Sequence, residues 1–320
     1  MNKVAIITGI TGQDGAYLAR LLLDKKYRVI GCAPTISEKD CWRLDHFGIT
    51  KKIKLVTGSL LDQNYLRLLL KKYQPQELYN FAGQSSVARS WEQPIETMET
   101  NALVVAQLLE ALRLYAPKTK FFQASSAEIY GQTDGIITEK NTTFHPVNPY
   151  GISKLAAHQM VATYRTRYGL FAVNGILFNH ESPLRMPDFV TKIMSHSVAE
   201  IARGIRKTFS LGSLTARRDF GYAADFVDGM WRLMQVPRPY DAVFCTGETH
   251  SIGDFAREAF AIVGIKDWRN HIILDPNLAR KREIKTMRGD HRLLTKLTGW
   301  KPVVGFCELV KIMIDFEMKQ

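Results

Sequence analysis

A glycine-rich turn near the amino terminus constrains the fold of this chain more than any other feature. The apolar run Val4–Thr8 leads at once into Gly9, Gly12 and Gly15, and an amphipathic segment, Asp14–Lys25, follows. Closely spaced glycines between a buried strand and a helix let the backbone turn tightly and approach a pyrophosphate, which the helix N-terminus then binds. The spacing is GxxGxxG instead of the standard GxGxxG, so a purely structural turn stays an alternative.

After this turn, short apolar runs alternate with amphipathic segments. The predicted strands are Val4–Thr8, Arg28–Ile30, Ile53–Val56, Glu77–Phe81 and Phe121–Ser125, and the predicted helices are Asp14–Lys25, Gln63–Tyr73, Ile95–Tyr115 and Lys154–Arg165. Such alternation implies right-handed βαβ crossovers and a parallel sheet that is covered on both faces. We therefore predict an α/β fold with a doubly wound, Rossmann-like parallel sheet.

The pattern changes after Phe178. Helices are expected at Phe189–Arg203, Ala224–Met234, Ile252–Val263 and Cys307–Phe316, with short strands at Val243–Thr246 and Ile272–Leu274. We predict a dinucleotide-binding domain over residues 1–177, with a later strand near 243–246, and a smaller mixed α/β substrate domain over residues 178–320. Ligands of doubly wound sheets bind beyond the carboxyl ends of the strands, where the second domain is expected to lie.

Composition narrows the class of protein. With 320 residues, of which 46% are hydrophobic, the chain can bury a sizeable core, so overall disorder is excluded. Four cysteines without CxxC spacing indicate neither a disulfide framework nor a metal site. No apolar run reaches the roughly 20 residues that span a bilayer, and Val4–Ile7 is too short for a secretory signal. We expect a cytoplasmic protein without a membrane partner.

The net charge of 43 − 31 = +12 calls for a partner hypothesis. The basic residues are dispersed in short clusters, without interleaved aromatic residues or a recognisable nucleic-acid motif, at 51–52, 71–72, 203–207, 217–218 and 280–282. We therefore interpret most of this charge as solvated surface and expect no nucleic-acid partner. A few arginines in a cleft would attract a small phosphorylated ligand.

The segment Tyr150-Gly151-Ile152-Ser153-Lys154 carries the most specific chemistry. On a helix, positions i and i+4 share one face, so the phenol and the ammonium can act together. A nearby ammonium favours phenolate, which predicts a lowered pKa of Tyr150 and a role in proton transfer. A surface tyrosine and lysine are the alternative.

Ser126 and Glu128 follow a predicted parallel strand, at the edge of the sheet where active-site groups collect. A serine hydroxyl there could bond a substrate alcohol, and a carboxylate two residues later could remove a proton next to a carbonyl. A Ser cap of a turn with a solvated Glu is the alternative.

The residues that separate NAD from NADP usually follow the second strand. The segment Gly31–Ile36 holds neither an acid for a ribose 2′-hydroxyl nor an arginine for a 2′-phosphate. Lys39 and Arg43 lie slightly further along and could reach a phosphate, or could be solvated loop charges.

Five segments together resemble the extended short-chain dehydrogenase/reductase family and, within it, the GDP-mannose 4,6-dehydratase family. They are TGITGQDGAYL (8–18), QASSAEIYG (123–131), NPYGISKL (148–155), NGILFNHESPLR (174–185) and ARRDFGYAADFVDGMW (216–231). The resemblance covers essentially the whole chain and carries site residues with it.

The resemblance implies that Ser126, Tyr150 and Lys154 form the hydride-transfer triad and that Glu128 is an additional acid/base. It places the cofactor, NADP with NAD as the alternative, on Gly9, Thr11, Gly12, Gln13, Asp14, Gly15, Arg43, Ala82, Gln84, Lys154, His180 and Arg185. It places the nucleotide sugar on Ser85, Asn179, Lys192, Arg218, Arg280 and Glu283. It also implies a homodimer or homotetramer.

Several positions depart from the family pattern. Ala33 and Pro34 stand where the family has a basic pair for the 2′-phosphate, and Ser59 replaces an acid that meets the cofactor adenine. Ile193 stands where a lysine is expected, although Lys192 precedes it. The segments Ala82–Gln84 and Met287–His291 are similar to related 4-keto-6-deoxy sugar reductases.

The resemblance implies redox-neutral 4,6-dehydration of a nucleotide sugar, GDP-mannose to GDP-4-keto-6-deoxymannose. A 4-ketosugar reductase or 4-epimerase acting on a GDP-linked sugar is the alternative on the same scaffold. Glu128 favours the dehydratase, because elimination across C5–C6 needs a base and simple C4 redox chemistry does not. A catalytically silent nucleotide- or RNA-binding regulator is the third hypothesis, and intact Ser126, Tyr150 and Lys154 argue against it.

Overall fold

The computed structural model describes residues 2–133, 135–140, 143–278 and 284–320. Within them, a seven-stranded sheet has the order β11-β6-β5-β4-β1-β2-β3, and every neighbouring pair is parallel. The strands are β1 (Val4–Thr8), β2 (Arg28–Ala33), β3 (Lys54–Thr57), β4 (Glu77–Asn80), β5 (Lys120–Ser126), β6 (Ala172–Leu177) and β11 (Ala242–Phe244). The predicted doubly wound α/β fold is confirmed.

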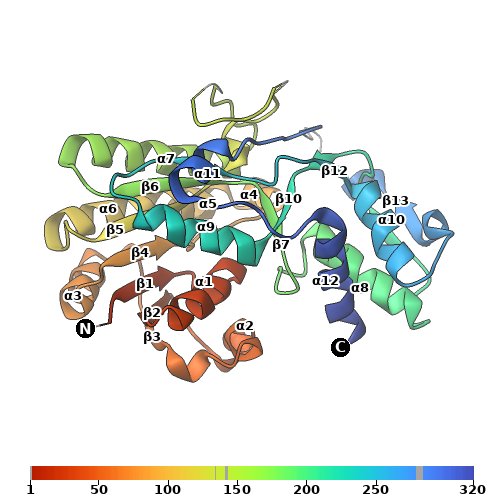
Figure 1. Ribbon diagram of the computed structural model, residues 1–320, viewed down its shortest axis with the longest axis horizontal. Helices are drawn as coiled ribbons and strands as arrows, with labels where there is room; N and C mark the ends of the chain where they lie inside the picture. The colour runs from red at the N-terminus through yellow and green to blue at the C-terminus, as the bar shows by residue number, and fades with distance from the viewer. Residues whose placement is uncertain (1, 134, 141–142, 279–283) are drawn as a thin grey trace.

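Helices cover both faces of this sheet (Figure 1). Because successive strand residues point to opposite faces, Ala5 and Ile7 of β1 join one core and Ile6 joins the other. The first core includes α1 (Gln13–Asp24), α2 (Trp42–His46), α9 (Ala223–Gln235) and α11 (Arg292–Thr298). The second includes α3 (Gln63–Tyr73), α6 (Val104–Tyr115) and α7 (Pro149–Tyr168).

The single helix predicted over Ile95–Tyr115 is interrupted. The structure has α4 (Val87–Glu92), α5 (Pro94–Met98), a wider π-helical turn η3 (Glu99–Leu103), and then α6. π-Turns inside helices often mark functional positions, and this one contains Asn101, which is 1% exposed. The π-turn η3 therefore continues the helix and also turns the Asn101 side chain into the interior.

A second lobe lies beside the sheet, on the right of Figure 1. Its apolar core joins α8 (Val190–Ala202), α10 (Ile252–Ile262) and α12 (Phe306–Met318). Three two-stranded sheets belong to residues 179–274: β7 (Asn179–Glu181) with β10 (Phe220–Tyr222), β9 (Arg217–Arg218) with β12 (His250–Ser251), and β8 (Phe209–Leu211) with β13 (Ile272–Leu274).

The chain crosses between the two lobes more than once. Strand β11 and helices α9 and α11 follow β7 in sequence, yet they pack on the large sheet. Trp300 anchors this return, because its ring packs against Phe244 and its indole N–H donates to Asp225 O at 2.8 Å. A single domain boundary at residues 177–178 stays a prediction.

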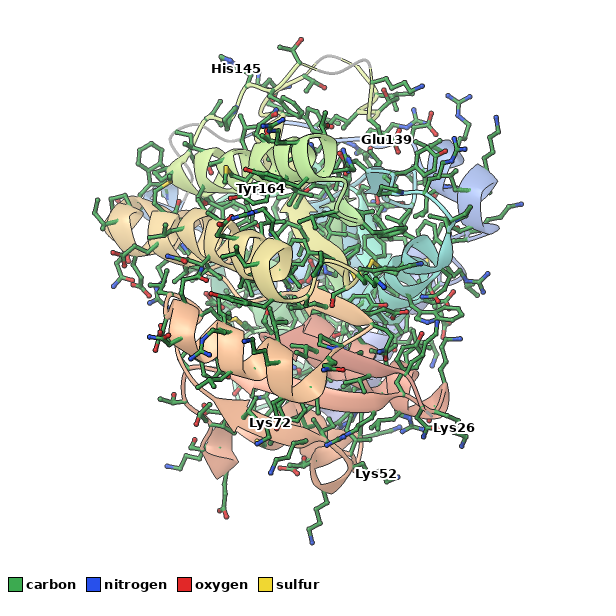
Figure 2. All side chains as sticks on the ribbon, turned by 90° about the vertical axis from the view of Figure 1, so that its left-hand side faces the viewer. Lys26, Lys52, Lys72, Glu139, His145 and Tyr164 are labelled. Atoms are coloured by element: carbon green, nitrogen blue, oxygen red, sulfur yellow. The ribbon has the colours of Figure 1, made fainter. Side chains whose placement is uncertain are left out.

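Two properties of the described residues bear on the expected partners: where charged side chains lie, and whether a helix could cross a membrane. Lys26, Lys52 and Lys72 lie toward one end of the molecule and His145 lies toward the other, above α7 (Figure 2). Among the helices that the structure describes, none combines the length and hydrophobicity that crossing a bilayer requires. The cytoplasmic location stays a prediction.

Candidate active site

The glycine-rich turn between β1 and α1 forms a cradle for an anionic ligand. Gly9 has φ +67°, and a Cβ there would lie 2.7 Å from the Phe81 carbonyl carbon. A Cβ on Gly15 would lie 2.4 Å from Gly9 O. Helix α1 begins at Gly12 without a side-chain cap, so its first amide N–H groups can bind a ligand. These residues fit the pyrophosphate of a dinucleotide.

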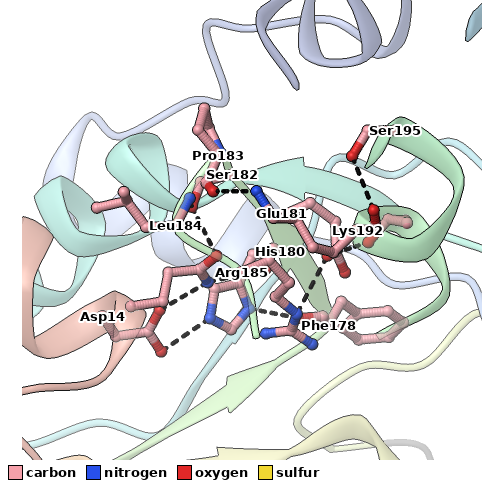
Figure 3. A network of polar contacts seen from close by, with 12 residues as sticks. Asp14, Phe178, His180, Glu181, Ser182, Pro183, Leu184, Arg185, Lys192 and Ser195 are labelled. Atoms are coloured by element: carbon pink, nitrogen blue, oxygen red, sulfur yellow. Dashed lines mark hydrogen bonds and ion pairs between the residues drawn. The ribbon is translucent and has the colours of Figure 1, made fainter. Parts of the chain in front are cut away.

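An ion pair ties this turn to the start of the second lobe (Figure 3). His180 Nε2 donates to Asp14 Oδ2 at 2.9 Å, and Nδ1 donates to Phe178 O at 2.8 Å. Burial opposes the charges, but the pairing prevails, so the pKa of Asp14 is lowered and the pKa of His180 is raised. With an acceptor at each ring nitrogen, His180 is held as the imidazolium, stacked on Phe226.

Two further side chains, those of Gln13 and Arg43, strengthen the same junction. Gln13 Nε2 donates to His180 O at 3.1 Å, and Ser182 Oγ donates to Gln13 Oε1 at 2.7 Å. Arg43 donates from Nε to Leu184 O at 2.7 Å and from an Nη to Thr11 O at 3.1 Å. The predicted cofactor residues of the turn and of segment 180–185 are therefore brought together.

Two arginines lie beside this turn, Arg43 buried and Arg185 partly buried. Burial and the neighbouring Arg185 lower the pKa of Arg43 to about 10. Arg185 Nε lies 3.1 Å from Glu181 Oε2, which also accepts from Thr191 Oγ1 at 2.6 Å. The cluster presents positive charge next to a cradle that suits phosphate.

The predicted catalytic residues meet at the carboxyl end of β5. Ser126 ends this strand, and Tyr150 and Lys154 lie one turn apart on α7. Lys154 Nζ donates to Ala124 O at 2.9 Å and lies 5.7 Å from the centroid of the Tyr150 ring. All three side chains are at most 9% exposed. The geometry can hold a sugar alcohol between a hydroxyl, a phenol and an amine.

The prediction that Lys154 lowers the pKa of Tyr150 is wrong. Burial raises the pKa of Tyr150 to about 12, and the charges of Glu128 and Asp14 add to that increase, although a hydrogen bond with Ser126 opposes it. Burial lowers the pKa of Lys154 to about 8, and Asp14 opposes this only in part. The lysine therefore does not hold the phenol ionised, because both groups are buried side by side.

Glu128 stands on a short 3₁₀ turn, η4 (Ala127–Ile129), directly after Ser126. Its backbone N–H donates to Ser126 Oγ at 3.2 Å, and its Oε2 accepts from Asn148 Nδ2 at 2.9 Å. The charge of Glu128 also raises the pKa of Tyr150, so the carboxylate lies near the phenol. Sequence reasoning missed Asn148, although its place one residue before Pro149 marks a helix cap.

Asn101 is a second functional candidate that sequence reasoning missed. Its amide accepts from Gln84 N at 2.9 Å and donates to Gln84 O at 2.9 Å and to Ser153 Oγ at 3.0 Å. A Cβ on Gly83 would lie 2.4 Å from Asn101 Oδ1. The π-turn thus fixes the loop that contains the predicted cofactor residues Ala82 and Gln84, and Ala82 N donates to Thr8 Oγ1 at 3.3 Å.

The predicted sugar-nucleotide residues are less closely grouped. Asn179 begins β7, and Ser85 is exposed after Gln84. Arg218 is buried and donates to Ile284 O at 2.7 Å. Arg280 and Glu283 lie outside the described residues, so their placement stays a prediction.

Lys192 is engaged within the protein. Its ammonium donates to Pro183 O at 2.8 Å and pairs with Glu317 of α12, and Figure 3 shows it near segment 181–185. Its predicted contact with the sugar nucleotide stays a prediction.

Solved structures share the fold of this chain. RMD from Pseudomonas aeruginosa, solved in complex with NADPH, has a TM-score of 0.83 at 22% identity, covering 99% of each chain. The dTDP-glucose 4,6-dehydratase of Bacillus anthracis, solved with NAD, has a TM-score of 0.86 at 18% identity, covering 99% of this chain and 97% of its own.

Sequence relatives are much more similar. GDP-mannose 4,6 dehydratase 1 of Arabidopsis thaliana is 40% identical, over 99% of this chain and 90% of its own length. The human GDP-mannose 4,6 dehydratase is 38% identical, over 99% of this chain and 92% of its own. A family model described as GDP-mannose 4,6 dehydratase matches residues 6–313. The chain therefore belongs to the GDP-mannose 4,6-dehydratase family.

Proposed function

We propose that this chain converts GDP-mannose to GDP-4-keto-6-deoxymannose with loss of one water and no net change of redox state. The observation that carries the proposal is the position of Glu128, hydrogen-bonded at the end of β5 beside Ser126 and close enough to Tyr150 to affect its pKa. Family membership over residues 6–313 supports the same reaction.

Ser126, Tyr150 and Lys154 act at C4 of the sugar, and Glu128 acts at C5 and C6. Tyr150 takes the proton of the C4 hydroxyl, Ser126 bonds the same oxygen, and Lys154 would hold the cofactor ribose. When bound, the nicotinamide supplies a reversible hydride acceptor and, in its oxidised form, a positive charge that favours the phenolate of Tyr150. Glu128 removes the proton from C5 and passes it to the departing C6 hydroxyl, so that the C5–H and C6–O bonds break and water leaves. The hydride taken from C4 would be the one returned to C6, and the proton held by Tyr150 would go to C5, so that the C5–C6 double bond left by the loss of water is reduced. The product then carries a ketone at C4 and a methyl group at C6, with no net change of redox state.

The direct test is incubation of the purified protein with GDP-mannose and no added reductant, followed by mass spectrometry. Loss of one water without net consumption of cofactor is expected. A requirement for stoichiometric NAD(P)H together with a 4-keto substrate would instead identify the related reductase, to which the segments Ala82–Gln84 and Met287–His291 are similar.

For the cofactor, NADP is the proposed form, with Arg43 as the 2′-phosphate contact in place of the missing basic pair. Arg43 is buried against Thr11 of the turn, and no carboxylate is among the groups that shift its pKa. Titration of the protein with NADP and NAD, by fluorescence, should show that Arg43→Gln weakens NADP binding more than NAD binding. Lys72→Gln, at an exposed position in the last turn of α3, is the control, and an equal effect of Arg43→Gln on both cofactors would contradict the assignment.

Self-association is also proposed. Large apolar side chains stay exposed on the adjoining elements α4, α5, η3 and α7, namely Trp91, Ile95, Met98, Leu103 and Ile152, which we call the α4–α7 patch. Contiguous apolar surface of this kind marks interfaces, and a two-fold contact would bring the same patch of two copies together. A homodimer through this patch is the simplest assembly.

A further inference from the structure

One side chain connects the first turn of α7 to Glu128. Asn148 is 6% exposed and caps α7, because its Oδ1 accepts from the Gly151 backbone N–H at 2.7 Å. The other end of the same amide donates from Nδ2 to Glu128 Oε2 at 2.9 Å. A backbone N–H can only donate, so the capping bond holds the oxygen of the amide toward the helix and the nitrogen toward the carboxylate.

The backbone around this amide is closely packed. A Cβ on Gly151 would lie 2.7 Å from Glu128 O and 3.0 Å from the Pro146 side chain. The first turn of α7 therefore sits directly against the turn η4 that carries Glu128. This packing fixes the position of the Glu128 backbone. The hydrogen bond from the Asn148 amide fixes the position of the Glu128 carboxylate.

We propose that Asn148 is a positioning residue, which aims the Glu128 carboxylate at the sugar carbon from which a proton is removed. This inference rests on the proposed dehydration. A serine or aspartate at position 148 would cap α7 equally well, since both accept from the N3 backbone N–H. Aspartate has no donor, and the single hydroxyl of serine ends closer to the backbone, so only the asparagine amide caps α7 with one atom and donates to Glu128 with another. The cap alone therefore does not explain this residue.

The experiment uses Asn148→Ser and Asn148→Asp in the full chain. Both variants keep a cap, and for Asn148→Ser the melting temperature and the affinity for GDP-mannose should match the wild type. Asn148→Ser removes the donor to a charged group, and kcat for water loss should fall about 10- to 100-fold. Asn148→Asp faces Glu128 with a like charge and should fall further. With GDP-mannose deuterated at C5, Asn148→Ser should show a larger isotope effect on kcat than the wild type, because removal of the C5 proton becomes slower.

A matched control comes from α3, which Asp62 caps by accepting from Asn64 N at 2.8 Å. α3 follows β3, an edge strand four positions from β5 in the sheet, so Asp62→Ser should leave kcat and the isotope effect unchanged. An unchanged kcat in Asn148→Ser, a fall without a larger C5 isotope effect, or a fall in proportion to lost stability and binding would each overturn the proposal. If the wild type makes no 4-keto product, the proposed function fails instead.

Discussion

At the scale of single residues, the glycines of the phosphate-binding turn are required to different degrees. A Cβ at Gly15 would lie 2.4 Å from Gly9 O and 2.8 Å from the Ile10 Cα, and neither backbone atom can move away without shifting the turn. A Cβ at Gly12 would meet only Gly9 O, at 3.2 Å. The spacing alone does not reveal this difference.

Gly15→Ala should therefore destabilise the protein by about 2–4 kcal/mol, because it overpacks a rigid turn, and should abolish dinucleotide binding. Gly12→Ala should lower stability by less than about 1 kcal/mol. Urea denaturation and cofactor titration of the two variants check the difference. Equal losses in both variants would show that the two glycines are not distinguished by their contacts.

Glu128→Gln tests the elimination step at one residue. The amide has the shape of the carboxylate but cannot take a proton, so water loss should fall by about 10²- to 10⁴-fold. Binding of GDP-mannose should remain measurable, because the predicted nucleotide contacts lie elsewhere. Mass spectrometry of the product and calorimetric titration of the sugar nucleotide measure the two effects, and undiminished product formation would remove Glu128 from the mechanism.

Single residues in short motifs could be predicted where the motif itself carries the chemistry. Tyr150, Lys154 and Ser126 lie together as expected, and their roles stay predictions. Asn148 and Asn101 were missed because their function comes from contacts with Glu128 and Gln84, which are distant in sequence. The raised pKa of Tyr150 was also missed, because burial depends on the whole pocket and not on the YxxxK spacing.

At the scale of elements, most long helices and strands could be predicted from their periodic or apolar pattern, and most strands of two or three residues could not. Helix Gln63–Tyr73 and strand Ile272–Leu274 match their predicted bounds, and most other long elements differ by a few residues. Strands β7, β8, β9, β10 and β12 were missed because their two or three residues form no continuous aliphatic run, whereas the equally short strand Ile272–Leu274 was predicted from such a run. β6 was missed too, although Ala172–Leu177 is a buried apolar run. The π-turn interrupts a continuous helical pattern because Asn101 turns inward to Gln84.

The pair Asp14–His180 joins two elements, α1 and β7, and predicts a pH-dependent stability. His180→Gln should lose about 3 kcal/mol near pH 5–6, because a buried pair is broken and Asp14 is left alone. The pKa of His180 is raised, so its contribution is present below the ordinary imidazole value and is lost as pH rises through the raised value. The pKa of Asp14 is lowered, so its contribution is lost only as pH falls through that lowered value.

Urea denaturation of the wild type and His180→Gln between about pH 5 and pH 9 measures this difference in unfolding free energy, which should shrink toward alkaline pH. His196→Gln is the matched control, because His196 pairs with Glu317 but its side chain is 53% exposed. Its loss should stay within about 1 kcal/mol. A difference for His180→Gln that is constant across this range would mean that the pair is not ionised in the folded protein.

At the scale of the whole molecule, the glycine-rich turn connects the two lobes. The turn of the sheet lobe contacts segment 180–185 through Gln13, Asp14 and Arg43, where the chain leaves β6 for the second lobe. A ligand held by the turn therefore also contacts the elements that orient the second lobe. These side-chain contacts hold the two lobes in the arrangement expected for a doubly wound sheet with a second domain. No repeat or change of composition along the sequence predicts them.

The α4–α7 patch makes the last prediction, which concerns assembly. Ile95 is 72% exposed, more than any other member of the patch, and Ile95→Glu would place a charge in an apolar contact between two copies. The wild type should sediment as a dimer or tetramer, and Ile95→Glu should shift it toward monomer, with a lower melting temperature that now depends less on protein concentration. Ile273→Glu is the control, since Ile273 is 51% exposed on β13 of the second lobe, outside the patch. Analytical ultracentrifugation checks the masses. If Ile95→Glu keeps the assembly and Ile273→Glu breaks it, the second lobe carries the interface, and the exposed apolar face of α5 and α7 needs another occupant.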